Sequence, residues 1–327
     1  YDMLSGKPIC GGPIKKAVPT TFEQFKERVA SEIKLFIENT EEMINGYEKY
    51  YIDINPAPLF SGTLDECVLS GKDAYDGGAK YNNTSIDLLG LASAVDSMLA
   101  IKYAVYDKKI VSFDELTRIL KDNWKDNERL RLILNQLCEK YGNNTAEANA
   151  LAKWMSEYAA SLINGKKNGR GGIYRCGMFS IDWYAEFGGG TGASADGRFA
   201  KEPLSKNICA VIGKDKKGVT EVINTVTGID YTKFPNGAVF DALLHPSAIS
   251  GDDGLDAAIG LFKTFIKKGG MSFQLNVLNP ETLKKAQKNP EMFETLQVRL
   301  CGWNVYFVNL SMREQNEFIK MAENTAE

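Results

Sequence analysis

Histidine is almost absent from this sequence, and its cysteines stand far apart. His245 is the only histidine in 327 residues, which excludes an HExxH zinc site and argues against a catalytic triad. No two of the six cysteines lie closer than 33 positions, so there is no C-x-x-C pair to begin a zinc or iron–sulfur site. We therefore expect no bound metal, and acid–base chemistry would fall to carboxylates, tyrosines or lysines.

Long apolar runs and an excess of charge of one sign are also missing. The most apolar stretch, 88–105, is interrupted by Asp96 and Lys102, and no basic-then-apolar signal segment opens the chain. The formal net charge is only -3, from 39 Lys and Arg against 42 Asp and Glu. These features predict a cytoplasmic protein whose partners include neither nucleic acid nor a membrane. Tyr1 stands where a methionine would start a complete chain, which suggests a piece of a longer protein.

The first 165 residues read mostly as helix. Thr20 and Glu23 have the spacing of a capping box, and apolar residues then recur every three or four positions until Gly46. Ser112 with Glu115 predicts another helix start. Further helices are expected over 86–106, around 130–137 and over 151–162.

The second half predicts alternating strands and helices. A glycine-rich break at 165–172 separates it from the helical half. The expected strands are 178–187, 208–212, 238–244 and 272–278. The expected helices are 255–267, 281–288 and 312–322, the last capped by Ser311 with Glu314. This alternation is typical of an α/β sheet or barrel.

Several motifs have a chemical interpretation and a more ordinary one. Residues 188–193 formally satisfy G-x-G-x-x-[GA], but no helix start follows directly, so a flexible turn is favoured over a nucleotide loop. His245 could donate a proton, although a partly buried loop histidine is the commoner case. The pair Asp252 and Asp253 precedes a predicted helix, where it would cap the helix. For Asp65 and Glu66, after a proline-rich loop, acid–base and structural roles stay equally open.

The most informative segment is 296–310. Two β-rich runs flank a single glycine, Gly302, which has no Asn or Asp beside it and so predicts a poor hairpin turn. A bulge or a close backbone approach would be the ordinary reason for this glycine.

These residues carry a resemblance. The run Val298 to Trp303, followed by an apolar aromatic strand and a terminal helix, resembles the radical-bearing loop of the glycyl radical enzymes, the pyruvate formate-lyase and dehydratase superfamily. The family's usual form is Arg-Val-x-Gly followed by Tyr or Phe, so Trp303 is a departure. Segments 269–277, 282–287 and 289–291 also fit, and Asp196-Gly197-Arg198 is similar to the family's Asp-Gly-Arg segment. Residues 55–60 and 77–82 resemble its helical lyase region.

The resemblance implies the fold and the domains. We expect the C-terminal part of a ten-stranded α/β barrel, with a helix-rich first half and the glycyl radical loop inserted in the barrel. Residues 1–195 would be the end of a pyruvate formate-lyase-like domain and residues 196–327 a glycine radical domain. The family's catalytic cysteine lies in a Gly-Cys-x-Glu context that this sequence lacks, and family members are more than twice as long. The chain is thus expected to begin just after the thiol loop.

The resemblance also implies the chemistry. A radical on a backbone α-carbon needs a near-planar centre, which a Cβ would crowd, so Gly302 is the storage position. A radical S-adenosylmethionine activating enzyme would remove one hydrogen from Gly302, and the radical would pass to the missing cysteine, which attacks the substrate. Arg299, Cys301 and Trp303 are expected to support the loop or contact the activating enzyme. Val298, Leu300, Val305 and Phe307 are expected to pack it away from water inside the barrel.

The expected activity is radical cleavage of a C–C or C–heteroatom bond in a small polar substrate, by a protein that binds no cofactor and forms a homodimer when full-length. The alternative is a non-enzymatic accessory subunit that carries the radical for a partner lyase. Because such subunits resemble only the terminal domain of the family, the similarity at 50–110 favours the enzyme. A nucleotide-dependent enzyme that uses the glycines at 188–193 is a third possibility.

Overall fold

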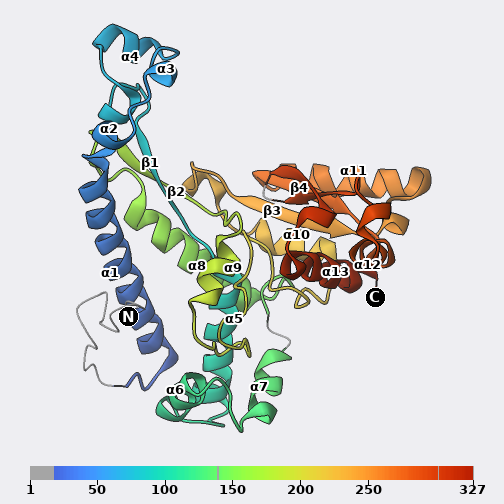
Figure 1. Cartoon of the computed structure of the whole chain (residues 1–327). Coiled ribbons are helices and arrows are strands. Elements are labelled where there is room, and N and C mark those ends of the chain that lie inside the picture. Colours follow the sequence, from blue (N-terminus) through green and yellow to red (C-terminus); the bar gives the residue numbers. More distant parts are fainter. Residues whose placement is uncertain (1–17, 138–139, 301, 327) are drawn as a thin grey trace. The chain divides into compact units, whose positions relative to one another are not determined.

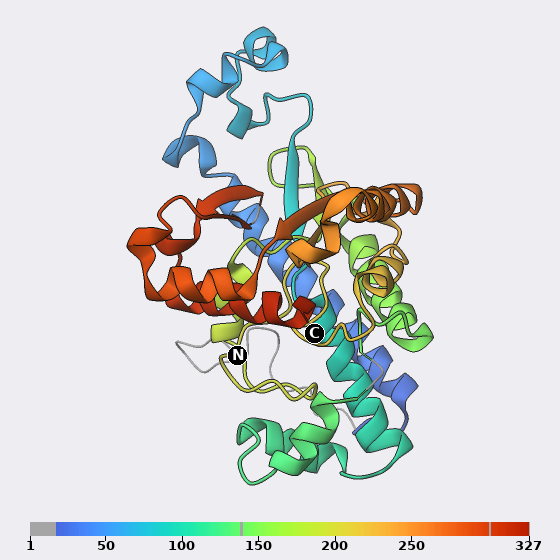
Figure 2. The same ribbon diagram turned by 90° about the vertical axis from the view of Figure 1, so that its right-hand side faces the viewer.

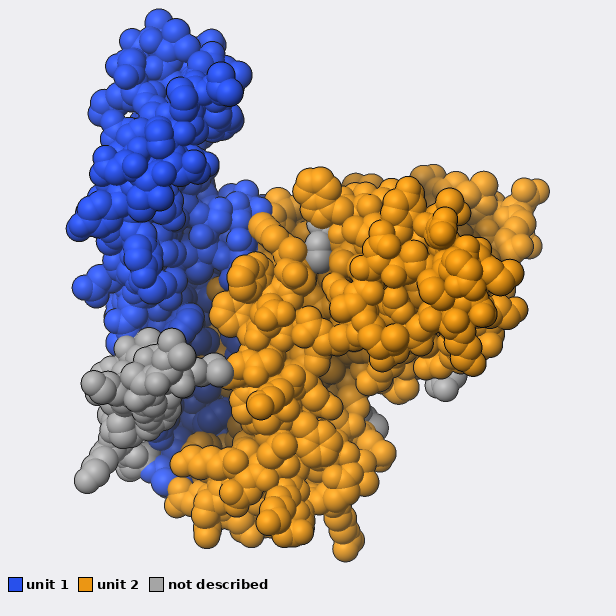
Figure 3. Space-filling view, viewed as in Figure 1, with its two compact units in different colours: residues 1–87, 155–177, 232–236 blue, residues 88–154, 178–231, 237–327 orange. Residues whose placement is uncertain are grey.

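The computed structural model describes residues 18–137, 140–300 and 302–326, with side chains up to residue 324 (Figure 1). The chain divides into two compact units (Figure 3). Unit 1 contains the described part of 1–87 together with 155–177 and 232–236. Unit 2 contains 88–154, 178–231 and 237–327. Each unit is thus assembled from separate stretches of sequence.

Unit 1 is built around one long helix and a pair of parallel strands. Its elements are α1 Phe22–Glu48, α2 Tyr51–Ile54, α3 Pro58–Ser61, α4 Asp65–Ser70, the 3-10 helix η1 Ala74–Asp76, β1 Asn83–Asp87 and β2 Ile173–Gly177, with the second part of α8 Ala146–Ile163. The predicted cap of α1 is one residue out of place: the hydroxyl of Thr21, not Thr20, accepts from Gln24 N. Gly46 lies inside the helix rather than at its end.

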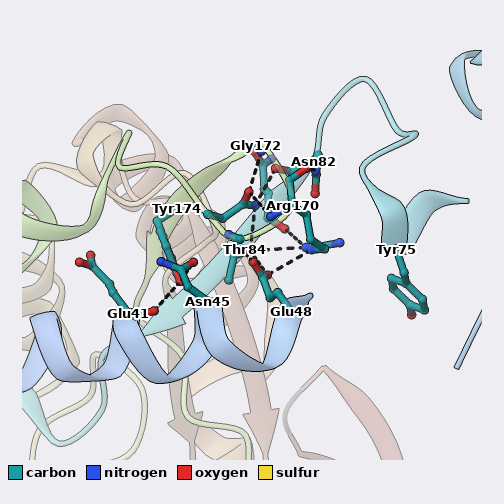
Figure 4. Close-up of polar contacts among 12 residues, drawn as sticks. Glu41, Asn45, Glu48, Tyr75, Asn82, Thr84, Arg170, Gly172 and Tyr174 are labelled. Atoms are coloured by element: carbon teal, nitrogen blue, oxygen red, sulfur yellow. Dashed lines mark hydrogen bonds and ion pairs between the residues drawn. The ribbon is translucent and has the colours of Figure 1, made fainter. Parts of the chain in front are cut away.

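A buried polar network joins the end of α1 to the two strands of unit 1 (Figure 4). Glu48 is 2% exposed, and its carboxylate accepts from the Thr84 hydroxyl on β1, from Gly169 N at 2.8 Å and from Arg170 Nε at 3.2 Å. Tyr174 on β2 donates through its hydroxyl to Asn45 Oδ1 at 2.9 Å. The glycine-rich break is therefore an ordered turn that is bonded to α1.

A close backbone approach explains one glycine of this break. A Cβ on Gly172 would lie 1.5 Å from the carbonyl oxygen of Asn82, so no side chain fits there. The side-chain oxygen of Asn168 accepts from Gly172 N at 2.6 Å and holds the turn closed. The glycine-rich composition of 165–172 therefore corresponds to a turn within unit 1 and not to a linker between domains.

Unit 2 holds the remaining helices and two further strand pairs. Its elements are α5 Leu91–Ile101, the π-helical turn η2 Lys102–Asp107, α6 Phe113–Lys121, α7 Glu128–Asn135, the first part of α8, α9 Trp183–Gly189, α10 Val219–Val226, the 3-10 helix η3 Tyr231–Lys233 at its border with unit 1, β3 Val239–Leu244, η4 Pro246–Ile249, α11 Gly251–Lys267, β4 Ser272–Val277, α12 Pro280–Lys288, η5 Pro290–Met292, β5 Gln297–Leu300, β6 Trp303–Tyr306, η6 Phe307–Asn309 and α13 Met312–Ala326. The helix starts predicted at Ser112 and Ser311 are confirmed, because each hydroxyl accepts from the backbone N–H three residues later.

Strands β3 and β4 run parallel and are joined by α11, which makes a β–α–β unit. One face of the pair is aromatic: Phe240 and Phe273 meet edge to face at 5.3 Å, and Phe265 of α11 packs on both rings. The next pair along the two strands is Asp241 and Gln274. Because successive residues of a strand point to opposite faces, this pair lies on the face away from the aromatic rings. The apolar face therefore fixes which side chains of β3 and β4 remain available for polar contacts.

Two predicted strands are wrong. Residues 178–187 lead into helix α9, and only Met178 forms a β-bridge, with Ala238. Residues 208–212 form turns and bends instead, and the Asp241 N–H of β3 donates to the Cys209 sulfur at 3.3 Å. The helix predicted from residue 86 begins at Leu91, after β1.

The predicted α/β class is confirmed at the level of mixed helices and parallel strands. Within the described residues the strands form three two-stranded sheets, β1–β2 and β3–β4 parallel and β5–β6 antiparallel, and no closed barrel. The ten-stranded barrel stays a prediction. None of the described helices combines the length and the hydropathy that crossing a bilayer requires.

We expect Glu48→Ala to lower the free energy of unfolding by about 3 kcal/mol, because it leaves Arg170 and Gly169 N without their buried acceptor. Glu42→Ala, an exposed site on the same helix, should change it by less than about 0.5 kcal/mol. Urea unfolding followed by circular dichroism measures both. Equal, small effects of the two substitutions would contradict a stabilising role of the network.

Asp96 of α5 gives a second prediction. It is 1% exposed, and burial raises the pKa of its carboxyl to about 7, although Oδ1 accepts from Tyr141 N at 2.8 Å. Because the folded protein holds this proton more tightly than the unfolded chain does, the contribution of the Asp96 carboxyl to stability should be complete below about pH 4 and be lost as the pH rises through 7. We expect Asp96→Asn to remove a loss on the order of 3 kcal/mol between pH 5 and 8 in urea titrations. The exposed Asp114→Asn should leave that pH dependence unchanged.

Candidate functional site: the hairpin at Gly302

The segment that carries the predicted radical position is a β-hairpin. In the β5–β6 pair Leu300 stands opposite Trp303, and Gly302 lies in the turn that precedes β6. Gly302 has a φ of +87°, in the left-handed region where a residue with a Cβ is strained by roughly 1–2 kcal/mol. The expectation that this glycine makes a poor hairpin turn is therefore wrong. Gly302 adopts the positive φ of the turn although no Asn or Asp stands beside it. Cys301 lies outside the described residues.

The backbone of Gly302 is held by one side chain. The residue is half-buried, and its N–H donates to Gln274 Oε1 at 3.1 Å. Among the described residues other than its chain neighbours, only Gln274 Nε2 lies within 4 Å of a Cβ built on Gly302, at 3.8 Å. Gln274 thus holds the main chain without crowding the α-carbon in the Cβ direction.

The apolar flanks of the hairpin pack as expected. Val298 and Phe307 are 2% and 0% exposed in a core cluster with residues of α12 and α13, and Leu300 and Val305 pack against it. Figure 2 shows the backbone of this C-terminal part of the chain in orange to red. The tip is not enclosed by the described residues, since the side chain of Trp303 is 73% exposed. No barrel wall is present among those residues to cover it.

Of the predicted supporting residues, the structure brings Arg299 and Trp303 into the hairpin. Arg299 Nη1 donates to Asn304 Oδ1 across the strands at 3.2 Å. The Arg299 backbone also bonds twice to the Asn276 side chain of β4. Arg299 therefore fastens the hairpin, whereas the Trp303 ring lies on its surface.

A polar row on the β3–β4 pair was missed by the sequence reasoning. Asp241 is 6% exposed, accepts from Asn207 Nδ2 and pairs with Lys206 Nζ at 3.3 Å, while its Oδ1 has no partner among the described residues. Gln274 and Asn276 continue the polar face toward the hairpin. The available signal was the alternation of polar and apolar residues within 272–277, which indicates a strand with one polar face.

A cavity of about 540 Å³ opens beside Asp241 within unit 2. Tyr184, Lys206 and Glu317 also line it, and the Tyr184 hydroxyl donates to Glu317 Oε2 at 2.6 Å. Burial raises the pKa of the Glu317 carboxyl. The size suits a small ligand, and the lining offers both charge and hydrogen-bond donors.

The other motifs have structural roles. The glycines at 188–193 lie at the end of helix α9, and the next helix, α10, begins only at Val219. A nucleotide loop needs a helix that starts directly after the glycines, and this described segment does not have one. Asp252 and Asp253 lie in the first turn of α11, and Asp65 and Glu66 in that of α4. Nδ1 of His245 lies 2.7 Å from the Ser247 hydroxyl at a helix start.

The Asp-Gly-Arg segment forms a buried turn. Arg198 is 6% exposed and donates to Ser194 Oγ at 3.0 Å and to the Glu202 carbonyl at 2.6 Å, while Asp196 accepts from Ser194 Oγ. A Cβ on Gly197 would lie 2.6 Å from Asn135 of α7. These residues hold the turn against α7. No three His, Cys, Asp or Glu side chains in the described ranges converge to bind a metal ion.

Comparison with known proteins gives a consistent result. The model of the pyruvate formate lyase-like family matches residues 1–188, and the glycine radical model matches residues 204–308. The (2S)-3-sulfopropanediol dehydratase of Klebsiella oxytoca is 33% identical over 93% of this chain and 38% of its own length. The trans-4-hydroxy-L-proline dehydratase of Clostridioides difficile is 32% identical over 99% of this chain and 41% of its own.

Among solved structures, a glycyl radical enzyme from Archaeoglobus fulgidus superposes with a TM-score of 0.89 at 31% identity, over 97% of this chain and 41% of that one. The chain thus spans about two fifths of the length of the relatives it matches. The matched models cover both the helical half and the segment with the hairpin. This chain belongs to the pyruvate formate lyase-like family of glycyl radical enzymes.

Proposed function

We propose that this chain is the C-terminal part of a radical lyase that stores its radical on Gly302. The observation that carries the proposal is the hairpin turn, where a glycine with a φ of +87° has its N–H bonded to Gln274 and is not crowded in the Cβ direction by that side chain. Loss of one α-hydrogen would leave a centre that can become planar because no Cβ crowds it.

The reaction class we propose is elimination from a small polar substrate, with dehydration favoured. The two enzymes named above from Klebsiella and Clostridioides are dehydratases of hydroxylated substrates. The charged and hydroxyl side chains of the cavity beside Asp241 agree with a polar substrate of that size. We propose that the thiol which attacks the substrate, on a Gly-Cys-x-Glu loop, comes from polypeptide outside this sequence, as do the remaining strands of a ten-stranded barrel that encloses the hairpin.

The partners follow from the same proposal. A radical S-adenosylmethionine enzyme would install the radical, and Arg299, Cys301 and Trp303 beside Gly302 would support the loop or meet that enzyme. The exposed Trp303 ring suits such a contact. We further propose a cytoplasmic homodimer in which 1–195 belongs to the lyase domain and 196–327 is the glycine radical domain.

Similarity along the whole chain favours the enzyme over the accessory subunit. The pyruvate formate lyase-like match covers the helical half, which a spare terminal domain would lack. Turnover of the full-length protein by itself, compared with turnover of this chain added to a partner lyase that carries the thiol, separates the two. Activity only with an oxygen-cleaved partner lyase would favour the accessory role.

The first test is electron paramagnetic resonance of the full-length protein after anaerobic activation. We expect a doublet from an organic radical, and its loss in Gly302→Ala. The matched control is Gly269→Ala: Gly269 has a φ of +86° and nothing within 4 Å of a built Cβ, so it imposes the same backbone strain outside the hairpin. A doublet that survives Gly302→Ala, or is lost equally in Gly269→Ala, would refute the assignment.

The second test uses oxygen. Air should cut the backbone of the activated protein at Gly302 and release the segment that follows it, of which 25 residues lie in this sequence (327 minus 302). Mass spectrometry should detect this fragment in the activated protein and not in activated Gly302→Ala. An intact chain after activation and aeration would count against a radical at this residue.

A further inference from the structure

Strand β4 directs two amide side chains toward the hairpin that carries Gly302. Gln274 and Asn276 are two positions apart, so they share one face of the strand. The opposite face carries Phe273, packed among the rings of β3 and α11. Because the aromatic rings fill that face of β4, Gln274 and Asn276 lie on the face that contacts the hairpin.

Asn276 binds the hairpin as a neighbouring strand would. Its Oδ1 accepts from Arg299 N at 2.8 Å, and its Nδ2 donates to the Arg299 carbonyl at 3.0 Å. This pair of bonds reproduces what one peptide of an adjacent strand would supply. Asn276 is only 6% exposed, so loss of its amide would leave the Arg299 N–H and C=O without partners in a shielded place.

Gln274 makes the corresponding contact at the turn. Its Oε1 accepts from Gly302 N at 3.1 Å, and its Nε2 is the one heavy atom near the Cβ direction of Gly302. The backbone at Gly302 is therefore oriented by the side chain of a residue that lies 28 positions earlier in the sequence.

We propose that Gln274 is a positioning residue for Gly302, with Asn276 as a second anchor at Arg299. The two amides hold the hairpin backbone at β5 and at the turn, and thereby fix the direction of the N–H bond next to the Gly302 α-carbon. This inference rests on the proposed radical function for its purpose, but the anchoring itself can be measured without a radical. Leu300 and the packed flanks hold the hairpin in place, whereas the amides determine its orientation at residue 302.

The first measurement is hydrogen exchange in the unactivated full-length protein, resolved at the amide of residue 302 by fragmentation mass spectrometry. Gln274→Leu removes the acceptor and should speed exchange at Gly302 about threefold to tenfold. Gln274→Glu retains an acceptor oxygen and should restore slow exchange. The matched control is Gln297→Leu, an exposed position on β5 of the same hairpin, which should leave exchange at Gly302 unchanged.

The second measurement is the radical signal of the same variants. Gln274→Leu should change the splitting of the doublet or shorten its lifetime at least threefold, and Gln274→Glu should recover both. The splitting follows the spin density on the α-carbon, which depends on how the flanking peptide groups are oriented relative to it. Asn276→Leu should speed exchange at Arg299 as well as at Gly302.

The outcomes separate the two claims. Unchanged exchange at Gly302 in Gln274→Leu, or the same change in Gln297→Leu, overturns the positioning role. Faster exchange in Gln274→Leu that Gln274→Glu reverses supports it. If exchange responds in this way and yet neither the variants nor the unaltered protein give a radical signal, the anchoring holds and the proposed function fails.

Discussion

The hydrogen bond between Gly302 N and the Gln274 side chain joins the parts of this molecule on which the proposed chemistry depends. It connects the turn of an antiparallel hairpin to a parallel strand pair whose other face is filled by aromatic rings. A residue with positive φ and no Cβ is necessary at the turn, but it would leave the α-carbon loosely oriented. The amides of β4 supply that orientation, and the β–α–β packing holds the amides.

A buried polar contact also organises unit 1. Glu48 ends α1 in a shielded position, where Arg170, Gly169 N and the Thr84 hydroxyl surround its carboxylate. A buried carboxylate with these partners is costly to disturb on one side only. The network thus determines where the turn at 165–172 meets the helix.

In unit 2 the unpaired oxygen of Asp241 stands in contrast to the satisfied network around Glu48. Asp241 has Lys206 and Asn207 as partners but retains one oxygen free among the described residues, beside a cavity of ligand size. A shielded acceptor without a partner is uncommon in a folded protein. Its position on the same strand face as Gln274 puts the polar cavity and the hairpin anchor on one continuous surface of β3 and β4.

The sequence alone determined the helices with strong periodicity, the capped start at Ser311 and strands β3 and β4, because these depend on local spacing. Gly302 became the residue of interest through the resemblance of 298–303 to the family's radical loop, together with its lack of a side chain. The sequence did not reveal that residues 178–187 end in a helix, or that Cys209 contacts β3, because those outcomes depend on contacts with distant residues such as Asn207 and Asp241. Only the tertiary structure decided that Gly302 sits in a hairpin turn and that Gln274 and Asn276 hold it. Nothing in the local sequence of 296–310 specifies which residues of another strand will supply its missing hydrogen bonds.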